Sequence, residues 1–342
     1  MSQEEDPLSM LNDLPPQAEQ RGFSSKEMVT CEACLRANPP TRTSCLYCQA
    51  VLPSTEGVAA LRKPTLRPLE TWEQGYNNVL TRREAGELPQ QQLAEVAALL
   101  RLESEDMERI LSKGEALPLA RAATVEEASL VQERLRALGV ETTIVPDADL
   151  AVEKLPLKRI RALELQEDVI VGREPASDSL LSIPWADVSL IVAGRLFVTQ
   201  VEVEENKFRG GERDLVDSRE LSADDGVLHI YGKDQESGWR IAAGSFDFSC
   251  LRERKGLLAS RNFALLLAVL RERAPSAEFD DSYIGVRQLL NAVWPLEQQT
   301  EARGWHRARP GKHNVKAVTT SDNESQFTRY SRLRHYLKLR GI

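Results

Sequence analysis

The sequence predicts a multidomain α+β protein, and three observations support that prediction. The first is size: a chain of 342 residues, 42% hydrophobic and 28% charged, is long enough for two or three domains with their own cores. The second is a change of pattern, because apolar residues recur at helical spacing within residues 72–150 but alternate in strand-like runs within residues 156–251. The third is that four of the five cysteines lie close together near the N-terminus, which indicates a separate small unit.

The segments on either side of the cysteines have the composition of tails and linkers. Residues 1–27 are polar, acidic and proline-containing, so we expect a disordered tail. Residues 53–71 carry Pro53, Pro64 and Pro68 among mixed polar residues, which suits a semi-rigid linker.

No segment has the pattern of a targeting or membrane-spanning sequence. The N-terminus lacks the basic and apolar regions of a signal peptide. The most apolar stretch, residues 180–201, alternates like a strand and is interrupted by Asp187 and Arg195, so it does not predict a transmembrane helix. We therefore expect an intracellular, cytoplasmic protein. Cys250, which stands alone among apolar neighbours, is interpreted as a small core residue.

Two Cys-x-x-Cys pairs, Cys31 with Cys34 and Cys45 with Cys48, are separated by ten residues. Thiolates are soft ligands that suit zinc, and four of them complete its tetrahedral shell. A closed shell leaves no position for water, so the pattern predicts one structural Zn²⁺ ion in a finger of residues 28–52 rather than a catalytic metal. The alternative is a pair of redox-active sites, which usually begin helices that follow strands.

The same segment resembles a zinc finger of the Ran-binding protein 2 type, with the pattern Cys-x2-Cys-x3-Asn-x6-Cys-x2-Cys and Asn38 at the asparagine position. The resemblance covers residues 29–48 and implies a small recognition module for single-stranded RNA or for ubiquitin. The chain departs from the family at Val29, where RNA-binding members carry a stacking tryptophan, and at Leu35-Arg36, where ubiquitin-binding members carry Thr-Phe.

Residues 72–150 predict a small α/β domain. The pattern is helical up to Gly114, with a second helix beginning at Ser104. A strand–helix–strand unit follows, in which strands at 117–122 and 140–145 flank a helix that begins at Thr124 with a capping box. No glycine-rich loop joins strand to helix, so the sequence predicts no nucleotide phosphate site here. No motif elsewhere indicates a small-molecule cofactor.

Residues 156–275 predict an antiparallel, barrel-like β domain closed by a C-terminal helix at 261–273. This order of elements resembles the plan of pleckstrin-homology-like domains, which implies a platform for lipids, peptides or proteins. The acidic and basic stretch 202–217 is interpreted as an exposed loop or hairpin tip. The expected strands are 158–165, 168–173, 185–196, 197–204, 227–231, 238–243 and 245–251.

Residues 276–342 predict a helical, basic C-terminal region. Helices are expected at 283–294 and from a capping box at Ser321 to about residue 339, with a loop at 303–313. Residues 303–342 carry ten Lys/Arg against two Asp/Glu, whereas the rest of the chain carries 34 against 50. The chain thus has an acidic majority and a basic end, which either binds an anionic partner or folds back on the acidic surface.

The sequence contains no recognisable catalytic constellation, so no enzyme activity is predicted. The preferred hypothesis is an interaction scaffold that docks another protein through the finger and the β platform. The alternative is nucleic-acid binding through the finger and the basic region 303–342. Charges on every side of the last helix argue against a membrane surface. The candidate nucleic-acid contacts are Arg36, Arg42, Arg303, Arg307, Arg309, Lys312, Arg329 and Arg332.

Overall fold

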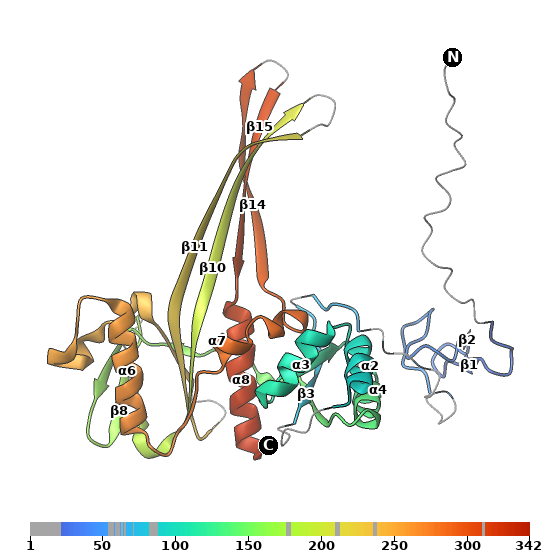
Figure 1. Cartoon of the computed structure of the whole chain (residues 1–342), viewed down its shortest axis with the longest axis horizontal. Coiled ribbons are helices and arrows are strands. Elements are labelled where there is room, and N and C mark those ends of the chain that lie inside the picture. Colours follow the sequence, from blue (N-terminus) through green and yellow to red (C-terminus); the bar gives the residue numbers. More distant parts are fainter. Residues whose placement is uncertain are drawn as a thin grey trace. The chain divides into compact units, whose positions relative to one another are not determined.

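The computed structural model describes residues 22–53, 58, 62, 64, 66–70, 72–81, 88–175, 179–208, 213–234, 238–309 and 312–342. The chain forms two compact units that divide after Thr65, and both helices and sheets are present, which confirms the multidomain α+β prediction (Figure 1). Most of the predicted disordered tail, residues 1–21, lies outside the described residues. We call residues 28–52 the finger and residues 66–342 the body.

The finger contains little regular structure. Strands β1 (Val29–Thr30) and β2 (Ala37–Asn38) form an antiparallel pair, and a single bridge joins Ser44 to Val51. Part of the predicted linker folds against the finger, since the buried Arg62 donates hydrogen bonds to the carbonyls of Leu52 and Pro53. The buried side chains of the finger's apolar core are Val29, Cys31, Cys45 and Leu52.

The α/β part of the body has a three-stranded sheet in the order β4-β3-β5. The predicted strand–helix–strand unit is present as β4 (Pro118–Ala122), α4 (Val125–Ala137) and β5 (Thr142–Pro146), and Thr124 caps α4 by accepting the Glu127 N–H. The helical interpretation of residues 72–114 is correct for α2 (Gln90–Leu100) and α3 (Ser104–Lys113) but wrong for β3 (Tyr76–Leu80).

β3 is the central strand of this sheet because it pairs with β4 on one side and β5 on the other. Asn77 and Asn78, which are poor strand formers, are fully buried there. The Asn77 amide donates to the Val145 carbonyl, and the Asn78 amide donates to the Ala128 carbonyl. These tertiary hydrogen bonds override the local propensity.

The second sheet is a curled half-barrel that also contributes a long ribbon (Figure 1). Its strand order is β14-β15-β10-β11-β12-β6, and β13 pairs with β10. The predicted strands 185–196 and 197–204 are one strand, β10, preceded by a short 3-10 helix, η2 (Trp185–Asp187). The bounds are β6 (Lys158–Arg159), β10 (Val188–Phe208), β11 (Arg213–Gly232), β12 (Gly238–Ala242), β13 (Glu278–Asp280), β14 (Glu297–Arg309) and β15 (Lys312–Asp322).

A third sheet, in the order β7-β8-β9, completes the β-rich part: β7 (Ala162–Leu165), β8 (Val169–Arg173) and β9 (Leu180–Pro184). Helix α6 (Ala259–Arg273) confirms the predicted helix at 261–273. The strand expected at 245–251 is wrong, because the segment forms two 3-10 turns, η3 (Ala243–Ser245) and η4 (Phe248–Arg254). The Asp247 side chain starts η4 by accepting the Ser249 N–H.

The C-terminal region differs most from its prediction. The expected loop at 303–313 belongs to the β14–β15 hairpin, which pairs with β10. The helix expected at 283–294 is broken into α7 (Tyr283–Val286) and the 3-10 turn η5 (Leu289–Ala292). Ser321 lies in β15 and does not cap a helix, because the last helix, α8 (Glu324–Arg340), begins after Asn323.

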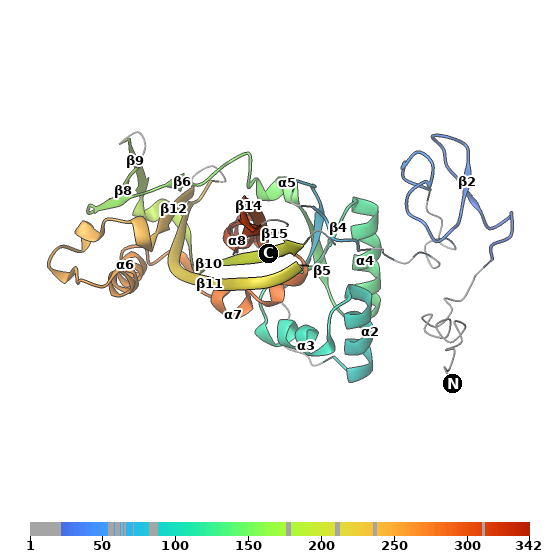
Figure 2. The same cartoon turned by 90° about the horizontal axis from the view of Figure 1, so that it is seen from above.

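Helix α8 joins the parts that the sequence divides at residues 150 and 275. Phe327 and Tyr330 on α8 are fully buried in one cluster that also contains Val145 of the α/β part and Leu190 of the curled sheet. Figures 1 and 2 both show α8 between these two parts of the body. The α/β part, the curled sheet and the C-terminal region therefore share a core. Among the described residues, no helix has both the length and the apolar character needed to cross a bilayer.

Candidate metal centre

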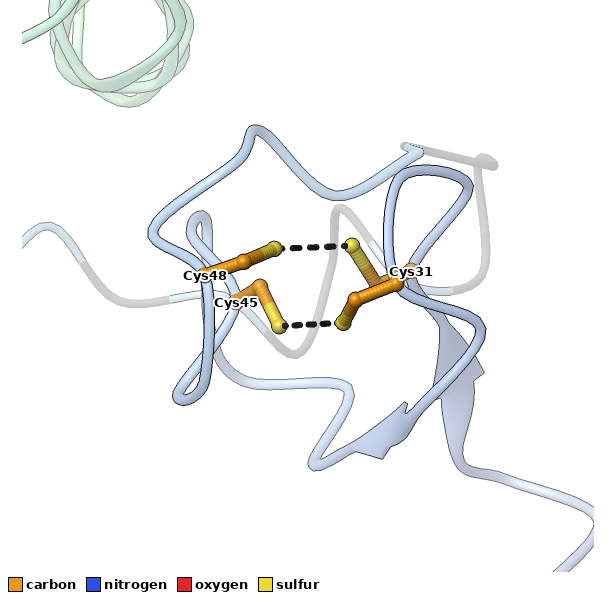
Figure 3. A group of neighbouring side chains, drawn as sticks. Cys31, Cys45 and Cys48 are labelled. Atoms are coloured by element: carbon orange, nitrogen blue, oxygen red, sulfur yellow. Dashed lines mark hydrogen bonds between the residues drawn. The ribbon is translucent and has the colours of Figure 1, made fainter.

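The four cysteine sulfur atoms of the finger converge on one point (Figure 3). All four lie within 4.8 Å of one another. The Sγ atoms of Cys31 and Cys48 are 3.6 Å apart, and those of Cys34 and Cys45 are also 3.6 Å apart. All four are free thiols, so the cluster is not a pair of disulfides. This arrangement confirms that the two Cys-x-x-Cys pairs form one site that could hold a metal ion.

Each cysteine pair is carried by the same backbone turn. In the first turn, the Leu35 N–H donates to the Cys31 carbonyl at 2.8 Å, and the Cys31 N–H donates to the Arg36 carbonyl at 2.9 Å. The second turn repeats the first bond, from Gln49 to Cys45 at 3.1 Å. Leu35 and Gln49 both adopt positive φ angles, 58° and 63°, which non-glycine residues rarely do. The repeated turn lets each pair present two sulfur atoms to the same side.

Asn38 ties the two turns together. Its side chain is fully buried, donates to the Arg36 carbonyl at 2.9 Å and lies 3.5 Å from the Cys45 sulfur. Its Oδ1 atom accepts the Leu46 N–H at 2.8 Å. The sequence placed Asn38 in a pattern, but only the structure shows that it is a positioning residue that connects the first turn to the second.

The sulfur atoms have unequal environments. Burial raises the pKa of the Cys45 thiol, but hydrogen bonds from the backbone N–H groups of Cys48 and Tyr47 outweigh it and lower the pKa to about 6. The Ala50 N–H lowers the pKa of Cys48, yet desolvation and the neighbouring sulfur atoms raise it to about 12. Four thiolates at this spacing repel one another, and a divalent cation between them would remove that repulsion.

The donor set and its spacing fit zinc. Zinc–thiolate bonds are about 2.3 Å, so the sulfur atoms of an ideal tetrahedron lie about 3.8 Å apart. The two 3.6 Å separations are close to that value. Cys31, Cys34, Cys45 and Cys48 would together hold the ion and leave it no open position. A metal bound in this way supplies folding energy and does not act on a substrate.

The finger's two candidate arginines lie in different settings. The exposed Arg36 has its guanidinium 4.6 Å from the centre of the Tyr47 ring, a cation–π contact. The Arg42 Nε–H donates to the Ser44 carbonyl at 3.1 Å, so this side chain supports its own loop. Leu35, Leu46 and Tyr47 are 78%, 47% and 55% exposed. The finger thus presents apolar surface beside Arg36.

The basic hairpin, β14 with β15, is basic by sequence and pairs with strand β10 of the same chain. Arg303, Arg307 and Arg309 belong to β14, and Lys312 begins β15. β15 pairs antiparallel with β10, and the register sets Lys316 of β15 opposite Glu204 of β10.

Arg329 and Arg332, the candidates on α8, face the interior. The Arg329 side chain is 14% exposed and its Nη1 lies 3.2 Å from the buried carboxylate of Asp147. Arg332 is 3% exposed and donates to the Leu155 carbonyl. Neither guanidinium is presented to a polyanion. Sequence reasoning missed this because the charges around α8 look solvated until their partners, a carboxylate and a backbone carbonyl far away in the chain, are known.

Asp147 is the acidic partner that organises this interior. Its carboxylate accepts the Gly75 N–H and the Asn77 amide, each at 2.8 Å, and forms an ion pair with Arg121 at 2.6 Å. With Arg329 it therefore connects the α/β sheet to α8. The carboxylate is 3% exposed, so its charge is balanced by these partners rather than by water.

A buried histidine and serine have the chemistry of a base and nucleophile but not the access. His229 Nδ1 lies 2.7 Å from Ser331 Oγ, which also contacts the Tyr231 hydroxyl at 2.8 Å. Burial holds the pKa of His229 well below its usual value, so the ring is neutral. Both residues are 0% exposed, so no substrate reaches them and the cluster is part of the core.

No protein-family model, no curated protein and no solved structure matches the chain. These comparisons therefore assign the chain to no family.

Proposed function

We propose that the protein is a cytoplasmic, zinc-stabilised interaction scaffold that docks another protein through the finger and the β-rich part of the body. The observation that carries the proposal is the convergence of four cysteine sulfur atoms within 4.8 Å. Reduced thiols in this arrangement suit the cytoplasm, where thiols stay reduced and clusters of four thiolates commonly bind zinc. The resemblance of residues 29–48 to Ran-binding protein 2 type fingers stays a prediction.

The exposed surface of the finger supports docking of a protein. Leu35, Leu46 and Tyr47 are exposed although they are apolar or aromatic, and they lie on the two turns that hold the cysteines. Aromatic residues and arginine are enriched in the centres of protein interfaces. A metal-braced turn also presents these side chains with little loss of conformational entropy on binding.

The first test is metal content. Full-length protein purified under reducing conditions is expected to carry one zinc ion per chain, measured by atomic emission. The variant Cys45→Ser is expected to lose that zinc, whereas Cys250→Ser, the matched change at the cysteine outside the cluster, is expected to keep it. Well under one zinc per chain in the unmodified protein would overturn the metal centre.

The second test separates protein binding from nucleic-acid binding. Because α8 is part of the body's core, truncation before it would unfold the body, so the basic hairpin is better tested by substitution. We expect fluorescence anisotropy with labelled single-stranded RNA and duplex DNA to show no binding at low salt. Salt-dependent, micromolar binding that disappears when Arg303, Arg307, Arg309 and Lys312 are all changed to Gln would instead establish the nucleic-acid function.

A further inference from the structure

One groove on the body has an excess of positive charge, although the chain as a whole is acidic. It has a volume of about 960 Å³ and lies between β7, η4 and α6. Five arginines line it against only two acids, in a chain whose net charge is −8. The arginines are Arg161, Arg173, Arg252, Arg254 and Arg273, and the acids are Glu164 and Asp247.

Both acids are already compensated, whereas three of the arginines are not. Glu164 forms an ion pair with Arg173, and Asp247 forms one with Lys255, each at 3.3 Å. In the part of the chain that the structure describes, the guanidinium groups of the other three make no ion pair or hydrogen bond. These uncompensated groups belong to Arg252, Arg254 and Arg273. The groove therefore carries an unbalanced charge that a ligand with carboxylates would neutralise.

One side of the groove is an edge of strand β7 that is largely unpaired among the described residues. β7 pairs with β8 along its other edge. On the groove side, the described residues supply one parallel bridge, from Ala162 to Asp247, with the Asp247 N–H donating to the Arg161 carbonyl at 2.7 Å. After Asp247 the chain forms η4 and does not continue to pair with β7. Residues 161–166 line the groove, a length of about 20 Å at about 3.3 Å per residue.

The backbone at the opposite wall is strained. Arg252 has φ 52° and ψ −125°, a conformation that is costly for a residue with a side chain. This strain falls on one of the three uncompensated arginines. Strained backbone of this kind persists where the surrounding structure fixes it, and it is found preferentially at ligand sites.

The apolar part of the lining distinguishes between anionic ligands. Leu163, Leu165, Val171 and Leu180 line the groove together with the arginines, and Leu180 is 58% exposed. A phosphate group would neutralise the arginines but leave these side chains without a partner. A peptide strand presents side chains alternately to two sides, so it can offer acids to the arginines and apolar groups to the leucines.

We propose that this groove binds an acidic, extended peptide segment of a partner protein, which adds a strand to the edge of β7 beyond the Ala162–Asp247 bridge. The inference rests on the interaction function proposed above and names a surface and a partner chemistry for it. It does not involve the finger, so the two proposals can fail separately.

The test uses a displayed library of random octapeptides selected on the full-length protein. We expect enriched peptides to alternate acidic with apolar residues. A triple variant is expected to bind the best synthetic peptide at least tenfold more weakly, measured by fluorescence anisotropy. Its substitutions are Arg252→Glu, Arg254→Glu and Arg273→Glu. A matched triple charge reversal outside the groove is expected to change the affinity for the peptide less than twofold. Its substitutions are Arg109→Glu, Lys154→Glu and Lys233→Glu.

A change in the peptide itself tests the strand addition without altering the protein. N-methylation of every second backbone amide is expected to abolish binding in one register and spare it in the other, because only alternate amides face β7. Equal binding of both methylated peptides would overturn the strand addition.

Selection of no peptide, or of peptides without acids, would overturn the proposal. So would arginine-dependent binding of phosphatidylcholine vesicles with 30% phosphatidylserine in place of peptides. The Cys45→Ser protein is expected to lose zinc but to select the same peptides. That result would show that peptide binding in the groove does not depend on the finger.

Discussion

The finger and the body are held together by different forces. The finger's core consists of four buried side chains, two of which are cysteines, whereas the body buries two large apolar clusters built around Phe327 and Trp239. An unfolded chain gains too little from four buried side chains to offset its conformational entropy. The finger, which is short of apolar residues, has four cysteines that could hold a metal ion, whereas the body relies on apolar burial.

The largest expected effect is the loss of the metal. Structural zinc in fingers contributes about 10–16 kcal/mol, so Cys45→Ser or a chelator is expected to unfold the finger. The body is expected to keep its melting temperature. All five tryptophans follow residue 65, so tryptophan fluorescence reports the body alone, and NMR amide dispersion of residues 28–52 reports the finger. A body that melts together with the finger would contradict this division.

The next effect concerns the charge network inside the body. Asp147→Ala is expected to lower the free energy of unfolding by about 3–5 kcal/mol, because it leaves the cations of Arg121 and Arg329 buried without their partner. Urea denaturation followed by tryptophan fluorescence measures it. Glu141→Ala, which removes an exposed ion pair with Arg136, serves as the control and should cost less than about 1 kcal/mol. Zinc content should stay unchanged in both variants.

A smaller effect is a loss of body stability in acid. Burial lowers the pKa of His229 and of His335 below the usual value of about 6.5, so below that pH the unfolded chain binds protons that the folded chain does not. Above about pH 6.5 the histidines do not lower the free energy of unfolding. As the pH decreases further, each histidine lowers it by up to about 1.4 kcal/mol per pH unit until the pKa of the folded state is reached. Urea denaturation at pH 7.5, 6.5 and 5.5 measures the slope.

The variant His229→Gln isolates one of these two groups. The amide can still hydrogen-bond Ser331 but does not titrate, so we expect a shallower dependence on pH between 6.5 and 5.5. An unchanged slope would show that burial of His229 does not contribute.

The smallest effect sharpens the description of the finger. Leu35→Gly is expected to stabilise the metal-bound finger by up to about 1 kcal/mol, because glycine adopts the positive φ at this position without strain. That change corresponds to about fivefold tighter zinc binding in a competition assay with a chelating dye. Ala33→Gly, in the same turn but without a positive φ, is the control and should weaken binding slightly. Weaker binding by Leu35→Gly would show that the leucine side chain matters more than the strain.

The sequence by itself determined the features that depend on short-range spacing. The cysteine pairs, the Thr124 cap of α4, the Gly114 end of α3 and helix α6 were all predictable, because each is specified by residues within a few positions. The cysteine cluster belongs to the same class, since two turns ten residues apart need little tertiary help to meet.

Only the tertiary structure decided the features that depend on distant partners. β3 is a strand because two other strands flank it, and residues 303–309 are a strand because β15 pairs with them. Arg329 and Arg332 are buried because they bind Asp147 and the Leu155 carbonyl, which lie 182 and 177 positions away. A local pattern records charge and hydrophobicity, but it does not record which distant group will balance a charge or complete a sheet.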